Sequence, residues 1–154
     1  MRPAYRVLAY LIAAEVAIQA AVIVFAMFGL VSWVDDGGVL DKAAVESESL
    51  EFEGVVGFML HAMNGLMVIP LLGLLLLVVS PFARIPGGVK WAAAVLGLIV
   101  VQVLLGLFAH EITSLGMLHG LNAFLLFGAA LMAGHRARVP SQVEAEGASE
   151  PILS

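Results

Sequence analysis

Four long apolar stretches occupy most of this chain and leave little room for a soluble domain. They run from Val7 to Val34, from Val55 to Val79, from Trp91 to Ala109 and from Leu115 to Ala133. Each is close to or longer than the roughly 20 residues that a helix needs to cross the hydrocarbon core of a bilayer. Because 62% of the 154 residues are hydrophobic and only 12% are charged, the sequence predicts a membrane protein.

These stretches predict an all-α fold, an up-down-up-down bundle of four transmembrane helices, because their connections are short. We expect one domain over residues 1–138, with spans at about residues 6–34, 54–80, 89–110 and 113–136. The first stretch is about twice as long as the apolar core of an export signal, which predicts a permanent span. Residues 139–154 contain too few apolar side chains to fold alone and are predicted to form a disordered cytoplasmic tail.

The basic residues predict how the chain lies in the membrane, because Lys and Arg are retained on the cytoplasmic side. Six of the seven flank the span ends that this topology places together: Arg2, Arg6, Arg84, Lys90, Arg136 and Arg138. The segment between the first two spans is acidic, and Lys42 is its only basic residue, so it is expected to face outward. We therefore expect a multi-pass protein of the bacterial cytoplasmic membrane, with the lipid bilayer as a partner and both termini cytoplasmic. The net charge of −5 gives no support for nucleic-acid binding, and the lack of cysteine excludes thiolate metal sites.

A short motif occurs twice, as MLHAMNG at residues 59–65 and as MLHGLNA at residues 117–123. A shift of 58 residues superimposes His61 on His119 and Asn64 on Asn122. The second and fourth spans run in the same direction, so both histidines are predicted to lie roughly 9–12 Å below the outer boundary. The repeat indicates a duplicated helix hairpin that carries one histidine in each copy.

His61 and His119 are predicted to approach a common centre inside the bundle. The second and fourth spans occupy diagonal corners about 11–14 Å apart, a distance that two inward imidazoles can bridge around a metal. A haem iron with two axial histidines fits this centre, which predicts heme b as the cofactor. Small residues leave clearance for a porphyrin beside the histidines: Gly57, Gly65, Gly116, Gly120 and Ala123.

Other interpretations of these residues stay open from the sequence. Small residues and buried polar side chains also pack membrane helices together without a cofactor. Asn64 and Asn122 are predicted either to form hydrogen bonds to neighbouring helices or to form hydrogen bonds that orient the metal ligands. A zinc or copper site is disfavoured, because zinc takes three or four ligands and no carboxylate lies within one turn of either histidine.

The first span carries a polar pair, Glu15 and Gln19, four residues apart on one helix face near the middle of the membrane. An ionisable residue at that depth is costly and marks a candidate functional site, here for protons or a quinone. The alternative is a protonated Glu15 that only bonds Gln19 or Gln102. His110 and Lys42, nearer the outer surface, are the predicted cationic partners of haem propionates.

Residues 102–127, QVLLGLFAHEITSLGMLHGLNAFLLF, resemble the third and fourth spans of one half of the haem A synthases. The matching residues are Gln102, Val103, Leu105, Gly106, Leu115, His119 and Ala123. Haem A synthases consist of two fused four-helix halves, each with one histidine in its second span and one in its fourth. The resemblance implies that this chain is a single half, with His61 and His119 around a b-type haem or a haem substrate. The whole chain also resembles an uncharacterised family of short four-span bacterial membrane proteins.

The chain departs from the haem A synthase pattern at two places. The first span ends in FGLVSWVDD instead of a Gly-Gly-x-x-Arg-Leu-Thr type sequence, and Val56, Gly57 and Phe58 stand where an acidic residue is expected. Hydroxylation of a haem methyl group is therefore not the leading expectation. Two chains could pair as a homodimer and so imitate the fused protein.

Three functional hypotheses follow from the sequence. The leading one is a bis-histidine b-type haem protein for electron transfer or haem handling, working with a redox partner or a quinone. The second is a cofactor-free accessory membrane subunit or small-ligand binder. The third is a haem-modifying enzyme of the oxidoreductase class, related to haem A synthase.

Overall fold

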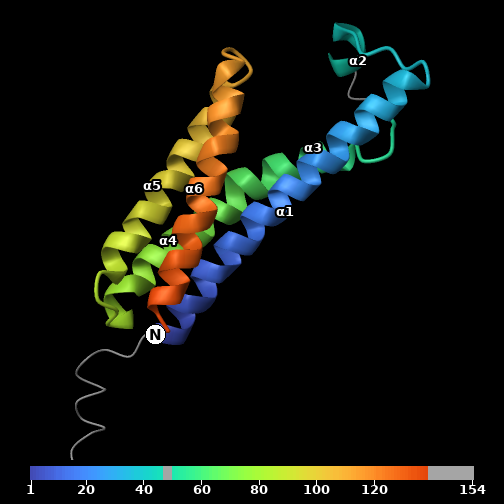
Figure 1. The fold of residues 1–154 in the computed structure, drawn as a ribbon. Helices are drawn as coiled ribbons and strands as arrows, with labels where there is room; N and C mark the ends of the chain where they lie inside the picture. Colours follow the sequence, from blue (N-terminus) through green and yellow to red (C-terminus); the bar gives the residue numbers. More distant parts are fainter. Residues whose placement is uncertain (47–49, 139–154) are drawn as a thin grey trace, which may run out of the picture.

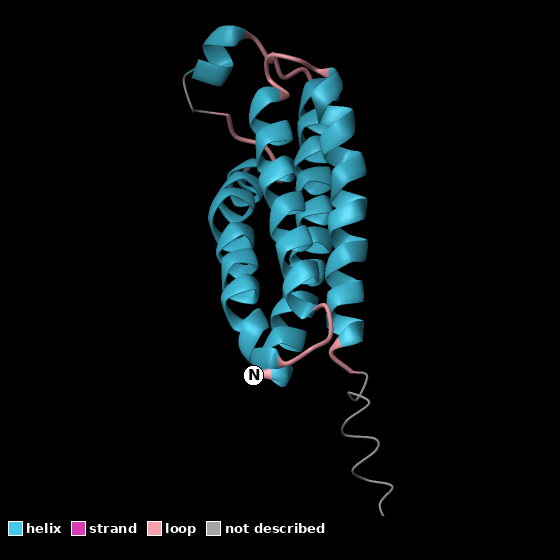
Figure 2. Ribbon diagram, turned by 90° about the vertical axis from the view of Figure 1, so that its left-hand side faces the viewer, coloured by secondary structure: helices cyan, strands magenta, loops and turns pink. Residues whose placement is uncertain are grey.

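The computed structural model describes residues 1–46 and 50–138, and these residues form an all-helical protein without strands (Figure 2). Four helical segments are long and apolar enough to cross a membrane: Arg2–Asp35, Val56–Ala83, Gly88–Phe108 and Ser114–Arg136. The predicted all-α class with four candidate spans is thereby confirmed. The tail predicted over residues 139–154 lies outside the described residues.

Three of these segments are single helices, α1 (Arg2–Asp35), α5 (Gly88–Phe108) and α6 (Ser114–Arg136). The second segment is composite, with α3 (Val56–Met63), the π-helical turn η1 (Asn64–Val68), α4 (Ile69–Val79) and the 3₁₀ turn η2 (Ser80–Ala83). The wide turn ends just before Pro70, which has no N–H to donate to the carbonyl of Leu66. Single π turns are frequent at functional sites, and this one follows His61 by three residues.

The helices pack as a ring in which the second and the last span lie at opposite corners. Helix α1 packs against α6 on one side and against α3 and α4 on the other, while α5 packs against α4 and α6. Helix α3, by contrast, packs mainly against α1. In Figure 1 the α1–α3 pair diverges from the α5–α6 pair with distance from the N-terminus. We call the end at which α1 ends and α3 begins the far end of the bundle.

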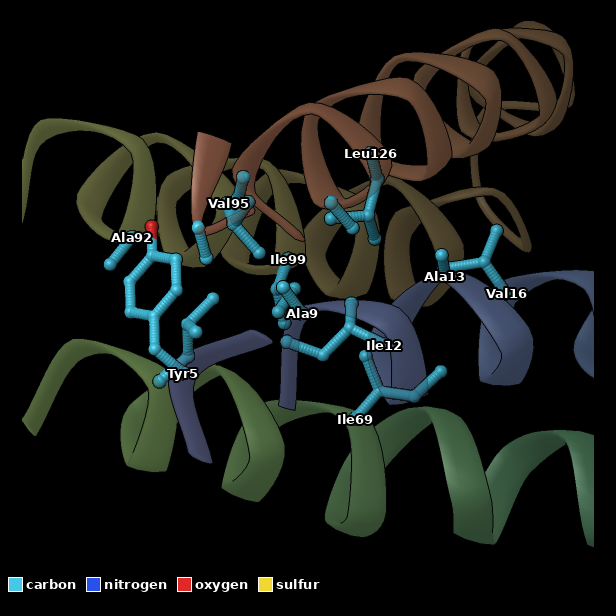
Figure 3. Packing of buried hydrophobic residues seen from close by; sticks show 14 of the residues in the cluster. Tyr5, Ala9, Ile12, Ala13, Val16, Ile69, Ala92, Val95, Ile99 and Leu126 are labelled. Carbon is cyan, nitrogen blue, oxygen red and sulfur yellow. The ribbon is translucent and has the colours of Figure 1, made fainter. Parts of the chain in front are cut away.

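The hydrophobic core lies in the half of the bundle near the N-terminus. Figure 3 shows how its side chains from different helices pack together. Helix α1 contributes Tyr5, Ala9, Ile12, Ala13 and Val16, whose spacing of three and four residues forms one helical stripe. The other spans contribute Ile69, Leu76, Ala92, Val95, Ile99, Leu126, Ala130 and Ala133. This packing holds together the half of the bundle that contains the N-terminus. The half toward the far end has room for a cavity.

Gly57 allows α3 to approach α1 closely. A Cβ atom at Gly57 would lie 2.8 Å from the carbonyl oxygen of Val22 and 2.9 Å from the Cβ of Ala26. We expect Gly57→Ala to push the two helices apart and to lower the free energy of unfolding by about 1–3 kcal/mol. Thermal unfolding in a mild detergent, followed by circular dichroism, measures this effect. Gly128→Ala is the control, since a Cβ there meets nothing within 4 Å; equal stability of the two variants would contradict this account of the contact.

Candidate functional site

A cavity of about 550 Å³ lies between the four spans and is lined mainly by apolar side chains. Its polar lining includes His61 and His119, together with Gln19 from α1 and Gln102 from α5. The volume falls in the range of roughly 300–1,000 Å³ that is typical of small-molecule and cofactor sites. The structure thus brings both histidines of the repeated motif into one cavity.

The two imidazole rings approach each other from opposite corners of the bundle. Their centroids are 6.2 Å apart, and their planes are inclined by 58°. Both histidines are half-buried, His61 on α3 and His119 on α6. The pair can therefore hold one atom or one thin group between the rings.

Each imidazole is oriented by a backbone carbonyl of a neighbouring helix. Nδ1 of His61 lies 3.2 Å from the carbonyl oxygen of Gln19, and Nδ1 of His119 lies 3.0 Å from that of Gln102. Because a carbonyl oxygen can only accept, Nδ1 carries the hydrogen and donates it, which leaves the lone pair on Nε2. Within residues 1–46 and 50–138, neither Nε2 atom has a hydrogen-bond partner. Metal-ligating histidines commonly show this arrangement, in which the second ring nitrogen donates to a carbonyl.

Side-chain amides fix the helices that carry these carbonyls. Nε2 of Gln19 donates to the carbonyl oxygen of His61 at 3.0 Å, so the two residues bond each other reciprocally. Nδ2 of Asn122 donates to the side-chain oxygen of Gln102 at 2.7 Å and to the carbonyl of Leu98 at 3.0 Å. Gln19 and Asn122 are buried. These bonds lock α1 to α3 and α5 to α6 at the level of the histidines.

Asn64 bonds Glu15, with Nδ2 of the amide donating to Oε2 of the carboxylate at 2.7 Å. Both asparagines therefore bond neighbouring helices, and neither lines the cavity. Glu15, for which the sequence left Gln19 or Gln102 as partners, bonds Asn64 instead. Glu15 does not line the cavity, whereas Gln19 does.

The cavity is built from two equivalent helix hairpins, α1 with the second span and α5 with α6. A shift of 83 residues aligns four cavity-lining positions of α1 with four of α5, and the shift of 58 aligns five of the second span with five of α6. The equivalent pairs are Val16 and Ile99, Gln19 and Gln102, Ala20 and Val103, Ile23 and Gly106, His61 and His119, Ala62 and Gly120, Gly65 and Ala123, Leu66 and Phe124, and Ile69 and Phe127. Equivalent positions of the two hairpins therefore make up most of the lining, whereas five lining residues have no counterpart in it: Leu107, Ala109, His110, Gly116 and Leu126.

The predicted small residues are distributed unevenly around the cavity. Gly65, Gly116, Gly120 and Ala123 line it, but Gly57 does not, because it is enclosed in the contact between α3 and α1. Gly65 makes room for the amide of Gln19, since a Cβ atom there would lie 3.2 Å from Nε2.

Gly106 lies close to the His119 ring and was not among the small residues predicted beside the histidines. A Cβ atom at Gly106 would lie 3.1 Å from both Cε1 and Nδ1 of the His119 ring. Gly106 and Gln102 therefore act together, one clearing space for the ring and the other accepting its hydrogen bond. The available signal was their spacing of four residues on one helix face.

The ligand set in the cavity limits which metals it can hold. Among the described residues there is no group of three or more His, Cys, Asp or Glu side chains that could bind a metal ion. His61 and His119 alone suit an iron whose remaining ligands come from a porphyrin, better than they suit zinc.

Comparison with protein-family models, with curated proteins and with solved structures found no match. What the chain does is therefore inferred from its sequence and from the geometry of the cavity.

Proposed function

We propose that this chain is an integral membrane protein that binds one b-type haem between His61 and His119, for electron transfer or haem handling. The observation that carries the proposal is the pair of imidazoles 6.2 Å apart, each with Nδ1 bonded to a backbone carbonyl and Nε2 available. A helix-packing role alone gives no reason for two rings with the same tautomer to meet in a cavity.

The separation of the rings fits a metal held between them. A histidine–metal bond is about 2.0 Å long, so two such bonds in line, together with the two ring radii, span about 6 Å between centroids. The cavity volume and its apolar lining also suit a large hydrophobic cofactor. His110 lines the cavity as well and is the candidate partner for a propionate, whereas Lys42 forms a 3.5 Å ion pair with Glu46.

The protein's own contribution is to hold the two imidazoles in one tautomer and one orientation. Gln19 and Gln102 provide the carbonyls, while Asn122 and the reciprocal Gln19–His61 bonds keep the hairpins in register. A haem held by His61 and His119 would supply one-electron chemistry, and with both histidines as ligands it would favour electron transfer over oxygen binding. Electron transfer is therefore the simpler role, and the apolar lining keeps water away from the site.

The haem site is proposed to lie toward the outer face of an up-down-up-down bundle in the bacterial cytoplasmic membrane, with both termini cytoplasmic. Two guanidinium groups support the orientation, because Arg136 lies 5.2 Å from the centre of the Trp91 ring and Arg138 lies 5.0 Å from that of Tyr10. Tyr and Trp are enriched at both membrane interfaces, whereas Lys and Arg are retained on the cytoplasmic side, so the two arginines support a cytoplasmic position for this end of α6.

The resemblance to haem A synthases supports a proposed relationship to one half of such an enzyme. On this proposal a homodimer would reproduce the arrangement of the two fused halves. A membrane quinone or a protein redox partner would exchange electrons with the haem.

Titration of the purified protein with hemin in a mild detergent tests the proposal. We expect the absorption change to saturate at one haem per chain, because the cavity has one pair of histidines. His135→Ala is the control and should bind equally, since His135 lies in the last turn of α6 and does not line the cavity. Absorption that rises without saturation, as for hemin dissolving in micelles, would contradict the proposal.

A further inference from the structure

The two equivalent hairpins differ in how the asparagine of the repeat is bonded. In the α5–α6 hairpin, Asn122 donates to the side-chain oxygen of Gln102. In the α1–α3 hairpin, Gln19 turns its amide to the carbonyl of His61, and Asn64 donates to the carboxylate of Glu15 instead. The shift of 83 residues aligns Glu15 with Leu98, so the α1–α3 hairpin carries an acidic residue at the position where the α5–α6 hairpin carries an apolar one.

Glu15 is the one acidic residue inside the four candidate spans of the described chain, apart from Asp35 at the end of α1. Its side chain is half-buried, and its hydrogen-bond donor, the amide of Asn64, is neutral. No salt bridge involves Glu15 within the described residues. A carboxylate without a cationic partner at this depth is costly, which makes a structural role alone a poor explanation for it.

Glu15 is connected to His61 in two ways. Glu15 lies one helical turn before Gln19, whose carbonyl accepts the Nδ1 hydrogen of His61. Through its own hydrogen bond it also contacts Asn64, three residues after His61. A change of charge between the histidines therefore acts on Glu15 through a medium of low dielectric constant, where electrostatic interactions are strong.

We infer that Glu15 takes up a proton when the site between His61 and His119 gains an electron, and releases it when the electron leaves. This inference rests on the proposed haem binding. The electron comes from a one-electron donor and the proton from the aqueous phase, so the carboxylate becomes a neutral carboxylic acid as the iron is reduced. Net charge inside the membrane stays constant, which lowers the electrostatic cost of reduction.

The other ionisable groups near α1 are few. Among the elements packed against it, α3 contributes His61, and α6 contributes His119, with His135 and Arg136 in its last turn. The segments η1, α4 and η2 contribute none. His110, beyond the end of α5, is a further ionisable side chain in the cavity. The comparison of the wild type with Glu15→Gln therefore separates the contribution of Glu15 from that of His110.

Redox titration of the hemin-loaded protein at several pH values tests the inference. The midpoint potential of the wild type should fall as the pH rises across the range in which Glu15 exchanges its proton, because reduction then binds a proton. Glu15→Gln should keep the haem spectrum and lose this pH dependence. Glu111→Gln, which removes an exposed acid beyond the end of α5, is the control and should behave like the wild type.

Infrared difference spectra give a second readout, and its first step uses the wild type alone. Reduction of the wild type should produce a carbonyl band of a protonated carboxylic acid, and a spectrum without such a band would already contradict the inference. The loss of this band in Glu15→Gln would assign it to Glu15. A haem-loaded wild type whose potential is independent of pH, or a variant that keeps the pH dependence, would overturn the role of Glu15 while haem binding stands. Failure of the wild type to bind hemin would instead overturn the proposed function.

Discussion

Replacing either His61 or His119 with alanine is expected to abolish six-coordinate haem binding. On the proposed haem binding, each ring would supply one ligand from its own hairpin, so the loss of one would leave the iron with a single protein ligand. The affinity for hemin should fall by more than the roughly 10–100-fold that loss of an outer-shell partner costs a metal site. Hemin titration and the absorption spectrum of each purified variant measure this directly.

The two histidine variants also carry an internal check on their folding. Each substitution opens space in the existing cavity, so free imidazole added to His119→Ala should enter and restore a six-coordinate spectrum. Circular dichroism should show unchanged helix content, since neither histidine belongs to the buried core cluster. If either variant kept the wild-type haem spectrum without added imidazole, the assignment of that histidine as a ligand would be wrong.

Gly106→Leu is expected to remove haem binding almost as completely, although it leaves both histidines in place. A Cβ atom at this position already lies 3.1 Å from the His119 ring, and a leucine side chain would displace the ring from the carbonyl of Gln102. The imidazole then loses both its orientation and its fixed tautomer. Hemin titration should show at least a tenfold loss of affinity.

Gly97→Leu on the same helix is the matched control for this prediction. A Cβ atom at Gly97 meets nothing within 4 Å, so its side chain should extend into the surrounding detergent or lipid. Helix content and hemin affinity should match the wild type. Equal hemin affinity of the two leucine variants would show that Gly106 does not position His119.

The all-helical class with four candidate spans follows from the length of the apolar stretches, because a membrane admits few alternatives to a helix. The repeated motif was informative because its two histidines lie at equivalent positions of helices that occupy opposite corners. Sequence could therefore indicate the pair, His61 and His119, before their separation was known.

The surroundings of the histidines could not be predicted in the same way. Their partners are backbone carbonyls of Gln19 and Gln102, and every residue has a carbonyl, so such contacts leave no sequence signature. Gly57 was expected beside the cavity because it lies one turn before His61. The hairpins diverge there, however, and the contact between α3 and α1 encloses it.

The equivalence of α1 and α5 was also hidden at the level of sequence. Among the paired cavity positions of these two helices, only Gln19 and Gln102 carry the same residue. Apolar side chains replace one another freely when they line a cavity, so the shift of 83 residues emerges only from the structure. The same alignment pairs Glu15 with Leu98, so Glu15 has no acidic counterpart.

Absorption spectra of the hemin-loaded wild type, recorded oxidised and after reduction with dithionite, test the central claim most directly. Two histidine ligands at one iron predict a low-spin six-coordinate spectrum in both oxidation states, with sharp bands after reduction and one haem per chain. A colourless protein despite ample hemin, or a high-spin five-coordinate spectrum, would contradict bis-histidine ligation by His61 and His119.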